Sequence, residues 1–94
     1  MRPRKTKEMR SVLEKKGFIP ANGDHVFLFL HVNGKKTRVR TKLSHGATEY
    51  GPPLLKLVAG QLHLTSSELD DLLDCPMSAI KYVGLLAQRG FLTG

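Results

Sequence analysis

Alternating hydrophobic and polar residues predict a β-hairpin near the middle of the chain. Two strand-like runs, over about residues 25–32 and 35–43, flank the dipeptide Asn33-Gly34. Asn-Gly is the strongest short-range hairpin signal, because both central residues of a type I′ turn take positive φ. The sequence therefore predicts two antiparallel strands that are joined by a two-residue turn.

A two-residue turn also predicts which residues face each other across the hairpin. Opposed residues share a face of the sheet, and successive side chains alternate between the two faces. The predicted cross-strand pairs include Leu28 with Val39, Phe29 with Arg38, and His25 with Lys42. One face is then apolar and is expected to face the core; from the first strand it takes Val26, Leu28, Leu30 and Val32.

The opposite face of the hairpin mixes aromatic and basic side chains. It is too basic for a core and too aromatic for an ordinary solvated face, so we interpret it as a nucleic-acid surface. The alternative is that the aromatic residues are buried under C-terminal helices or in a dimer. The side chains predicted on this face are those of His25, Phe27, Phe29, His31, Lys36, Arg38, Arg40 and Lys42.

Apolar residues at helical spacing predict four helices around the hairpin, and a short edge strand is predicted over 18–21, where Pro20 lacks a backbone donor. Thr65 and Glu68 match a capping box at the start of the third helix. The predicted helices span about 7–16, 53–63, 66–74 and 77–89.

Three finer expectations concern the ends and faces of these elements. Residues 1–5 are predicted to form a mobile basic arm. Gly60 is predicted to let the second helix pack closely on the sheet. The last helix is predicted to bury Ile80, Val83, Leu86 and Ala87.

The order of elements predicts an α+β fold in a single domain over residues 1–94. Three antiparallel strands in sequential order form the sheet, and helices gather on one of its faces. The chain has 94 residues, of which 40% are hydrophobic and 24% are charged, as is typical of one small globular domain.

Charge is distributed unevenly along the chain, and this distribution bears on the kind of partner that the protein binds. The net charge is +7, with 12 Lys or Arg against 3 Asp or Glu in residues 1–44 and 3 against 5 in residues 45–94. A basic half that contains the hairpin indicates a polyanionic partner. The longest apolar run, Val26 to Leu30, is too short to span a bilayer, and the single cysteine precludes an internal disulfide, so a cytoplasmic protein without membrane contact is expected.

The order of elements and several short motifs resemble the HicA (YcfA-like) family of toxin–antitoxin systems. The resemblance covers about residues 6–64 and rests on Lys16-Gly17-Phe18, Gly23-Asp24-His25, the Asn33-Gly34 turn, and His45 soon after the third strand. It implies a double-stranded-RNA-binding-domain-like fold, α-β-β-β-α, with residues 65–94 as a C-terminal extension of two helices. It also implies an mRNA endoribonuclease, the toxin, that a HicB-like antitoxin protein holds inactive.

The histidine of Gly-x-His is catalytic in that family, so the resemblance implies this role for His25. The predicted position opposite Lys42 adds a physical reason, because a nearby positive charge lowers the pKa of imidazole and keeps it neutral. Neutral imidazole can remove the proton of an RNA 2′-hydroxyl, which then attacks the neighbouring phosphate. The residues expected to bind RNA are Lys36, Arg38, Arg40, Lys42, Phe27, Phe29 and His45, the last also a candidate proton donor.

Two other functions remain open. The family's usual serine is Asp24 here, and residues 65–94 exceed the usual family length; both departures favour a non-catalytic RNA-binding module on the same fold. A helix-turn-helix over residues 66–92 would bind DNA, but that segment is rich in carboxylates that repel phosphates.

A metal site and a cofactor are not expected. The candidate ligands are scattered through the chain without standard ligand spacing, so surface histidines and a buried thiol are the simpler interpretation. These candidates are His31, His45, His63 and Cys75.

Overall fold

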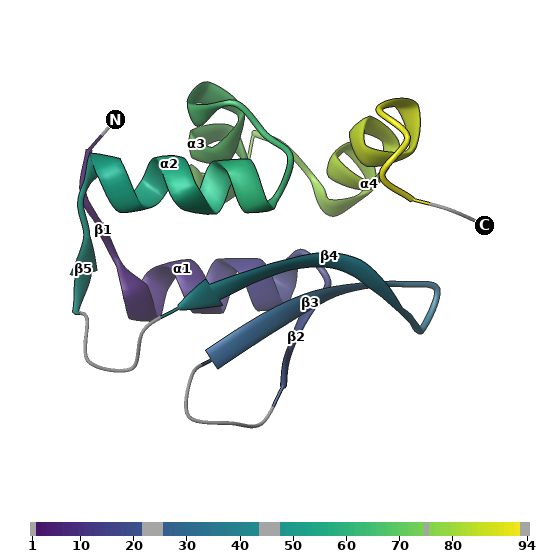
Figure 1. Ribbon diagram of the computed structural model, residues 1–94, viewed down its shortest axis with the longest axis horizontal. Helices are drawn as coiled ribbons and strands as arrows, with labels where there is room; N and C mark the ends of the chain where they lie inside the picture. The colour runs from purple at the N-terminus through teal and green to yellow at the C-terminus, as the bar shows by residue number, and fades with distance from the viewer. Residues whose placement is uncertain (1, 22–25, 44–47, 75, 93–94) are drawn as a thin grey trace.

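The computed structural model describes residues 2–21, 26–43, 48–74 and 76–92 (Figure 1). Within these ranges the chain forms a mixed α+β fold with four helices, a three-stranded antiparallel sheet and a small two-stranded sheet. The elements are β1 (Arg4–Lys5), α1 (Thr6–Lys15), β2 (Phe18–Ala21), β3 (Val26–Val32), β4 (Lys35–Leu43), β5 (Glu49–Tyr50), α2 (Pro52–Gln61), α3 (Ser66–Asp74) and α4 (Ala79–Gln88).

The three-stranded sheet has the predicted order, β2-β3-β4, and all pairs are antiparallel. Asn33 and Gly34 form the turn with φ of 53° and 77°, as the Asn-Gly signal predicts. The helices lie on one side of this sheet (Figure 1). The coarse fold class is therefore confirmed.

The register of the hairpin differs from the prediction beyond the first two pairs. Val32 pairs with Lys35 and His31 with Lys36, as expected, but an irregularity follows and Phe29 pairs with Arg40 instead of Arg38. The shift is two residues, so the paired residues beyond the irregularity stay on their predicted faces. Leu28 accordingly remains fully buried although it faces Thr41 rather than Val39.

The core lies between the sheet and the helices, and the C-terminal helices contribute fully to it. Tyr82 of α4 is 0% exposed, stacks on Phe18 of β2 with ring centroids 6.0 Å apart, and donates a hydrogen bond to the carbonyl oxygen of Leu62 at 3.0 Å. Because the phenol hydroxyl has a partner, the large ring can be buried without an unpaired polar atom. The helices α3 and α4 thus contribute to the same core as the hairpin.

The prediction of which α4 side chains are buried is wrong in part. Tyr82 and Leu86 are buried, whereas Ile80 is 86% exposed and Ala87 is also exposed. Ile80 lies two residues from Tyr82, which places it on the opposite side of the helix. The helix starts at Ala79 rather than near residue 77, because the Ser78 side chain caps it by accepting from the Lys81 amide.

The expectation for Gly60 is also wrong. Gly60 is exposed, and a Cβ added there would meet no atom within 4 Å. Leu55, Val58 and Ala59 form the buried side of α2 instead.

The basic N-terminus is not a mobile arm over residues 2–5. Arg4 and Lys5 form β1, which pairs with Tyr50 and Glu49 of β5. The Arg4 guanidinium, 11% exposed, bonds Asp70 at 2.8 Å and Asp74 at 2.6 Å, and its hydrogen bond to Asp74 lowers the pKa of that carboxyl group. This segment therefore ties α1 to α3, and part of its positive charge is neutralised within the fold.

No helix in the described part of the chain is long and apolar enough to cross a membrane.

Candidate nucleic-acid interface

The sheet surface that points away from the helices is the candidate interface. We call it the outer face; it consists of Ile19, Phe27, Phe29, His31, Lys36, Arg40 and Lys42. The aromatic residues are half-buried and the three cations are exposed. The strands β2, β3 and β4 and the turn between the last two contain no Asp or Glu, so these described segments contribute positive charge and no carboxylate to this face.

Phe27 and Phe29 lie side by side on the outer face, with ring centroids 6.4 Å apart and ring planes at 34°. The Lys36 Nζ lies 4.0 Å from the Phe29 centroid. The Arg40 guanidinium lies near both rings, at 6.0 Å from Phe27 and 5.9 Å from Phe29. The Lys42 Nζ lies 5.9 Å from the Phe27 centroid. These distances are within the range of cation–π attraction, which holds the long cationic side chains over the rings.

This arrangement combines two properties that single-stranded nucleic acid requires. Exposed cations attract phosphates, and aromatic rings offer flat surfaces for unpaired bases. The proposed alternative, burial of the phenylalanines under the C-terminal helices, is wrong, because those helices lie on the other side of the sheet.

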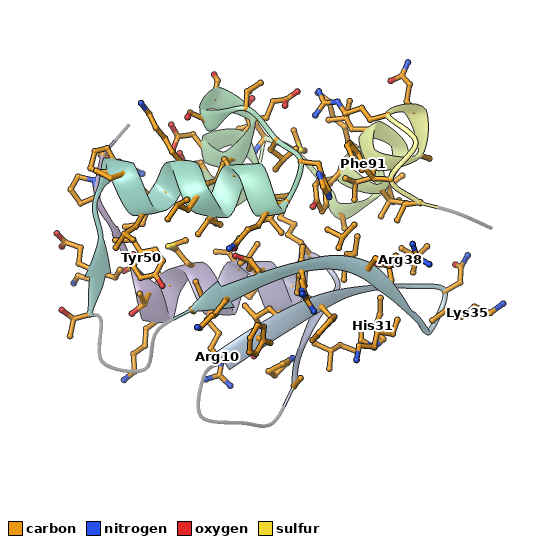
Figure 2. All side chains as sticks on the ribbon, viewed as in Figure 1. Arg10, His31, Lys35, Arg38, Tyr50 and Phe91 are labelled. Carbon is orange, nitrogen blue, oxygen red and sulfur yellow. The ribbon has the colours of Figure 1, made fainter. Side chains whose placement is uncertain are left out.

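Arg38 does not join the other cations, although its predicted face is the same. It falls in the irregular stretch of β4 between the pairs His31–Lys36 and Phe29–Arg40. Arg38 lies on the side of the sheet toward Phe91, whereas His31 lies on the outer face (Figure 2). A bulge changes where a strand residue points, so the predicted set of four cations separates into three on the outer face and one at the strand edge.

His31 is the histidine of the described chain that lies on the outer face. Its Nδ1 is 3.0 Å from the carbonyl oxygen of Phe29. A carbonyl oxygen only accepts, so Nδ1 is the donor in this contact. This contact orients the ring through Nδ1, so Nε2 is the ring nitrogen left for contact with a ligand.

Two predicted site residues, His25 and His45, lie outside the described residues, as does Cys75. The expected pairing of His25 with Lys42 is wrong, because Lys42 pairs with Phe27. The argument for a lowered His25 pKa from that lysine therefore no longer holds. Among the residues that the structure describes, no three His, Cys, Asp or Glu side chains gather as a metal site would require.

Sequence reasoning missed two exposed apolar residues, one on the outer face and one on the other side of the sheet. Ile19 is 51% exposed and pairs with Phe29, so it extends the apolar part of the outer face onto β2. Alternation in the edge strand, with Phe18 inward, was a signal that could have placed it. Phe91 is 42% exposed and stacks on His63, but no local pattern predicts a contact between residues that follow different helices.

Comparison of the chain with protein-family models, with curated proteins and with solved structures finds no match.

Proposed function

We propose that the protein binds RNA through the outer face and is a HicA-like, metal-independent mRNA endoribonuclease of the cytoplasm. The observation that carries the binding proposal is the cluster of Phe27 and Phe29 with Lys36, Arg40 and Lys42 on described strands that contain no Asp or Glu. The catalytic part rests on the resemblance, which implies a general-base role for His25. The same resemblance supports a double-stranded-RNA-binding-domain-like fold and a HicB-like antitoxin as the protein partner.

Single-stranded RNA is the preferred polymer for this surface. Paired bases hide their faces in the stack, so Phe27 and Phe29 can contact only unpaired bases. Phosphates can draw Lys36, Arg40 and Lys42 away from the rings and so free those rings for stacking. Cleavage by a neighbouring 2′-hydroxyl would restrict the chemistry to RNA.

A non-catalytic RNA-binding module is the second candidate, and one structural observation favours it. Leu69, Leu72 and Tyr82, all in the segment beyond the family's usual length, are 0% exposed in the shared core. The protein therefore depends on packing that the family does not use, and Asp24 stands where the family has serine. A protein with these changes can keep the binding surface and lose cleavage.

The helix-turn-helix reading is weaker. In the fold, α4 would be the recognition helix, yet Ala79–Gln88 contains one cation, Lys81. Three of the four carboxylates of α3 instead bind residues of this chain: Asp70 and Asp74 bond Arg4, and Glu68 bonds Arg89. These carboxylates are explained by folding, and α4 lacks the cations that phosphate contacts need.

The binding proposal is tested by replacing Lys36, Arg40 and Lys42 with glutamine and measuring affinity for an unstructured RNA over a series of salt concentrations. If all three bind phosphates, affinity should fall and the salt slope should shrink by about 0.7 for each lost contact. The matched control replaces Lys7, Lys15 and Lys56, three exposed helical lysines, and removes the same charge. Equal loss in both triple variants would show that only net charge matters and would overturn the outer-face assignment.

A further inference from the structure

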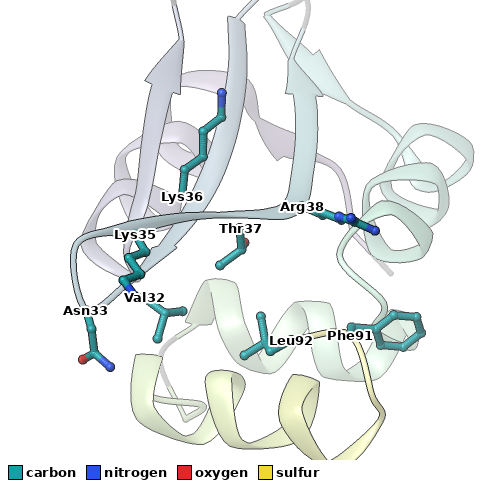
Figure 3. A pocket seen from close by; sticks show the side chains of 8 residues that line it. All are labelled: Val32, Asn33, Lys35, Lys36, Thr37, Arg38, Phe91 and Leu92. Carbon is teal, nitrogen blue, oxygen red and sulfur yellow. The ribbon is translucent and has the colours of Figure 1, made fainter. Parts of the chain in front are cut away.

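A hollow of about 450 Å³ lies at the edge of β4, between the hairpin end and the C-terminal segment (Figure 3). Val32, Thr37 and Leu92 lie in its middle, and Arg38 and Phe91 lie at one end. Asn33 and Lys35 lie at the other end. Its volume is in the range of small-molecule sites, about 300–1,000 Å³.

The charges around this hollow favour an anion. Lys35, Lys36 and Arg38 line it, and none of the described residues that line it is Asp or Glu. Lys36 points away from the other lining side chains and places its Nζ over Phe29 of the outer face. The hollow is therefore adjacent to the outer face around the β4 edge, and the two surfaces share Lys36.

The aromatic wall of the hollow is held in a defined position. Phe91 stacks on His63 with ring centroids 3.6 Å apart and planes at 9°. Arg89 fixes the preceding turn, because it donates to the His63 carbonyl oxygen at 2.8 Å and bonds the Glu68 carboxylate at 2.6 Å. Since the Phe91 residue is still 42% exposed, its ring is presented to solvent in a fixed orientation. A fixed aromatic ring loses little conformational entropy when a flat ligand stacks on it.

We propose that this hollow binds one unstacked nucleotide, with Phe91 against the base and Arg38, at the same end of the hollow, on its phosphate. A planar base suits the Phe91 ring. The proposal deepens the proposed RNA binding and rests on it, because it adds a single-nucleotide site next to the outer face.

The test is an NMR titration of the full chain with the four ribonucleoside 5′-monophosphates, and separately with inorganic phosphate and with uncharged nucleosides. The expected result is that nucleotides shift the backbone amides of Val32, Lys35, Arg38 and Phe91 more than phosphate or nucleoside does. Equal shifts with phosphate alone would reduce the hollow to a simple anion site and overturn the proposal. No shift of these amides at millimolar nucleotide would also overturn it.

Variants separate this site from the outer face. Phe91→Leu keeps an apolar side chain but removes the stacking ring, and it should weaken nucleotide binding on the order of tenfold. Arg38→Gln should weaken nucleotide binding but not nucleoside binding, and Lys56→Gln, which removes a charge on α2, should change neither. Shifts confined to Phe27, Phe29 and Arg40 would refute the hollow while leaving outer-face binding intact. If nucleotides bind in the hollow but the outer-face triple variant and the helical-lysine triple variant lose the same RNA affinity, the outer-face assignment alone is refuted.

Discussion

Thr37 donates a hydrogen bond from its hydroxyl to the backbone carbonyl oxygen of Leu30 across the hairpin, at 2.7 Å. The same hydroxyl oxygen accepts from the Val39 amide at 3.2 Å. Both contacts lie where the register of β3 and β4 shifts by two residues. One side chain thus satisfies a backbone acceptor and a backbone donor inside the irregular stretch, where the regular ladder is interrupted.

Thr37→Val is therefore expected to lower the free energy of unfolding by more than the loss of an exposed hydrogen bond would. Valine has nearly the same shape but leaves those backbone groups without the hydroxyl, which costs roughly 1–3 kcal/mol when they are shielded from water. Urea unfolding measures the loss, and Thr48→Val, at an exposed threonine, is the control. If both variants unfold at the parent's urea concentration, the hydroxyl does not stabilise the bulge.

Leu28→Ala tests the predicted core face. Leu28 is 0% exposed, so its truncation should create a cavity and lower the free energy of unfolding by roughly 2–5 kcal/mol. Leu57→Ala is the same substitution at a residue that is 61% exposed, and it should cost less than about 0.5 kcal/mol. Similar losses for the two variants would contradict the assignment of the hairpin faces.

The parts of the fold that were predictable from sequence are those set by local signals. Asn33-Gly34 located the hairpin turn, and the Thr65–Glu68 capping box located α3, where both reciprocal hydrogen bonds form at 2.9 and 3.2 Å. Period-two alternation placed Leu28 inward even though its partner was wrong, because a two-residue shift preserves the faces.

The parts that were not predictable depend on contacts between distant segments. The bulge in β4 relies on Thr37 reaching Leu30, and it separated Arg38 from the other cations of the candidate site. Arg4 was expected to be mobile, but carboxylates about 70 positions later in the chain bind it. Contacts between residues so far apart in the sequence do not produce a local or periodic pattern from which they could be predicted.

Glu68 should make stability depend on pH in acid. Its hydrogen bond from Arg89, followed by that from the Thr65 amide, lowers the pKa of the carboxyl group from 4.5 to about 2. A lowered folded-state pKa means that the contribution is complete above the unfolded value and is lost as pH falls from about 4.5 toward 2.

Glu68→Gln should therefore lower the thermal midpoint at neutral pH and flatten its decline between those two pH values. Thermal unfolding across that pH range measures both effects. Glu49→Gln removes the same charge at an exposed position of β5 and serves as the control. A parent-like decline in Glu68→Gln would mean that other carboxyl groups cause the acid sensitivity.

The catalytic role proposed for His25 is tested by the chemical ends of the cleaved RNA and by comparison with a variant of a second histidine. If the attacking group is the RNA 2′-hydroxyl, the protein should cut RNA in the presence of EDTA, leave 2′,3′-cyclic phosphate ends and spare DNA, which lacks that hydroxyl. A positioned general base typically contributes 10²–10⁴-fold, so His25→Ala should abolish visible cleavage while RNA binding by the outer face persists.

His31→Ala is the matched control, because His31 is a histidine of the outer face whose Nδ1 is held by the Phe29 carbonyl oxygen. With His25 as the base, His31→Ala should still cut, and the rate should rise with pH near the ordinary histidine value of about 6.5 before it levels off. Cleavage that survives His25→Ala but not His31→Ala would transfer the role to His31. RNA binding without cleavage in the parent would instead support the non-catalytic module. Asp24→Ser would then be the first substitution to make, because the resemblance places serine directly before His25.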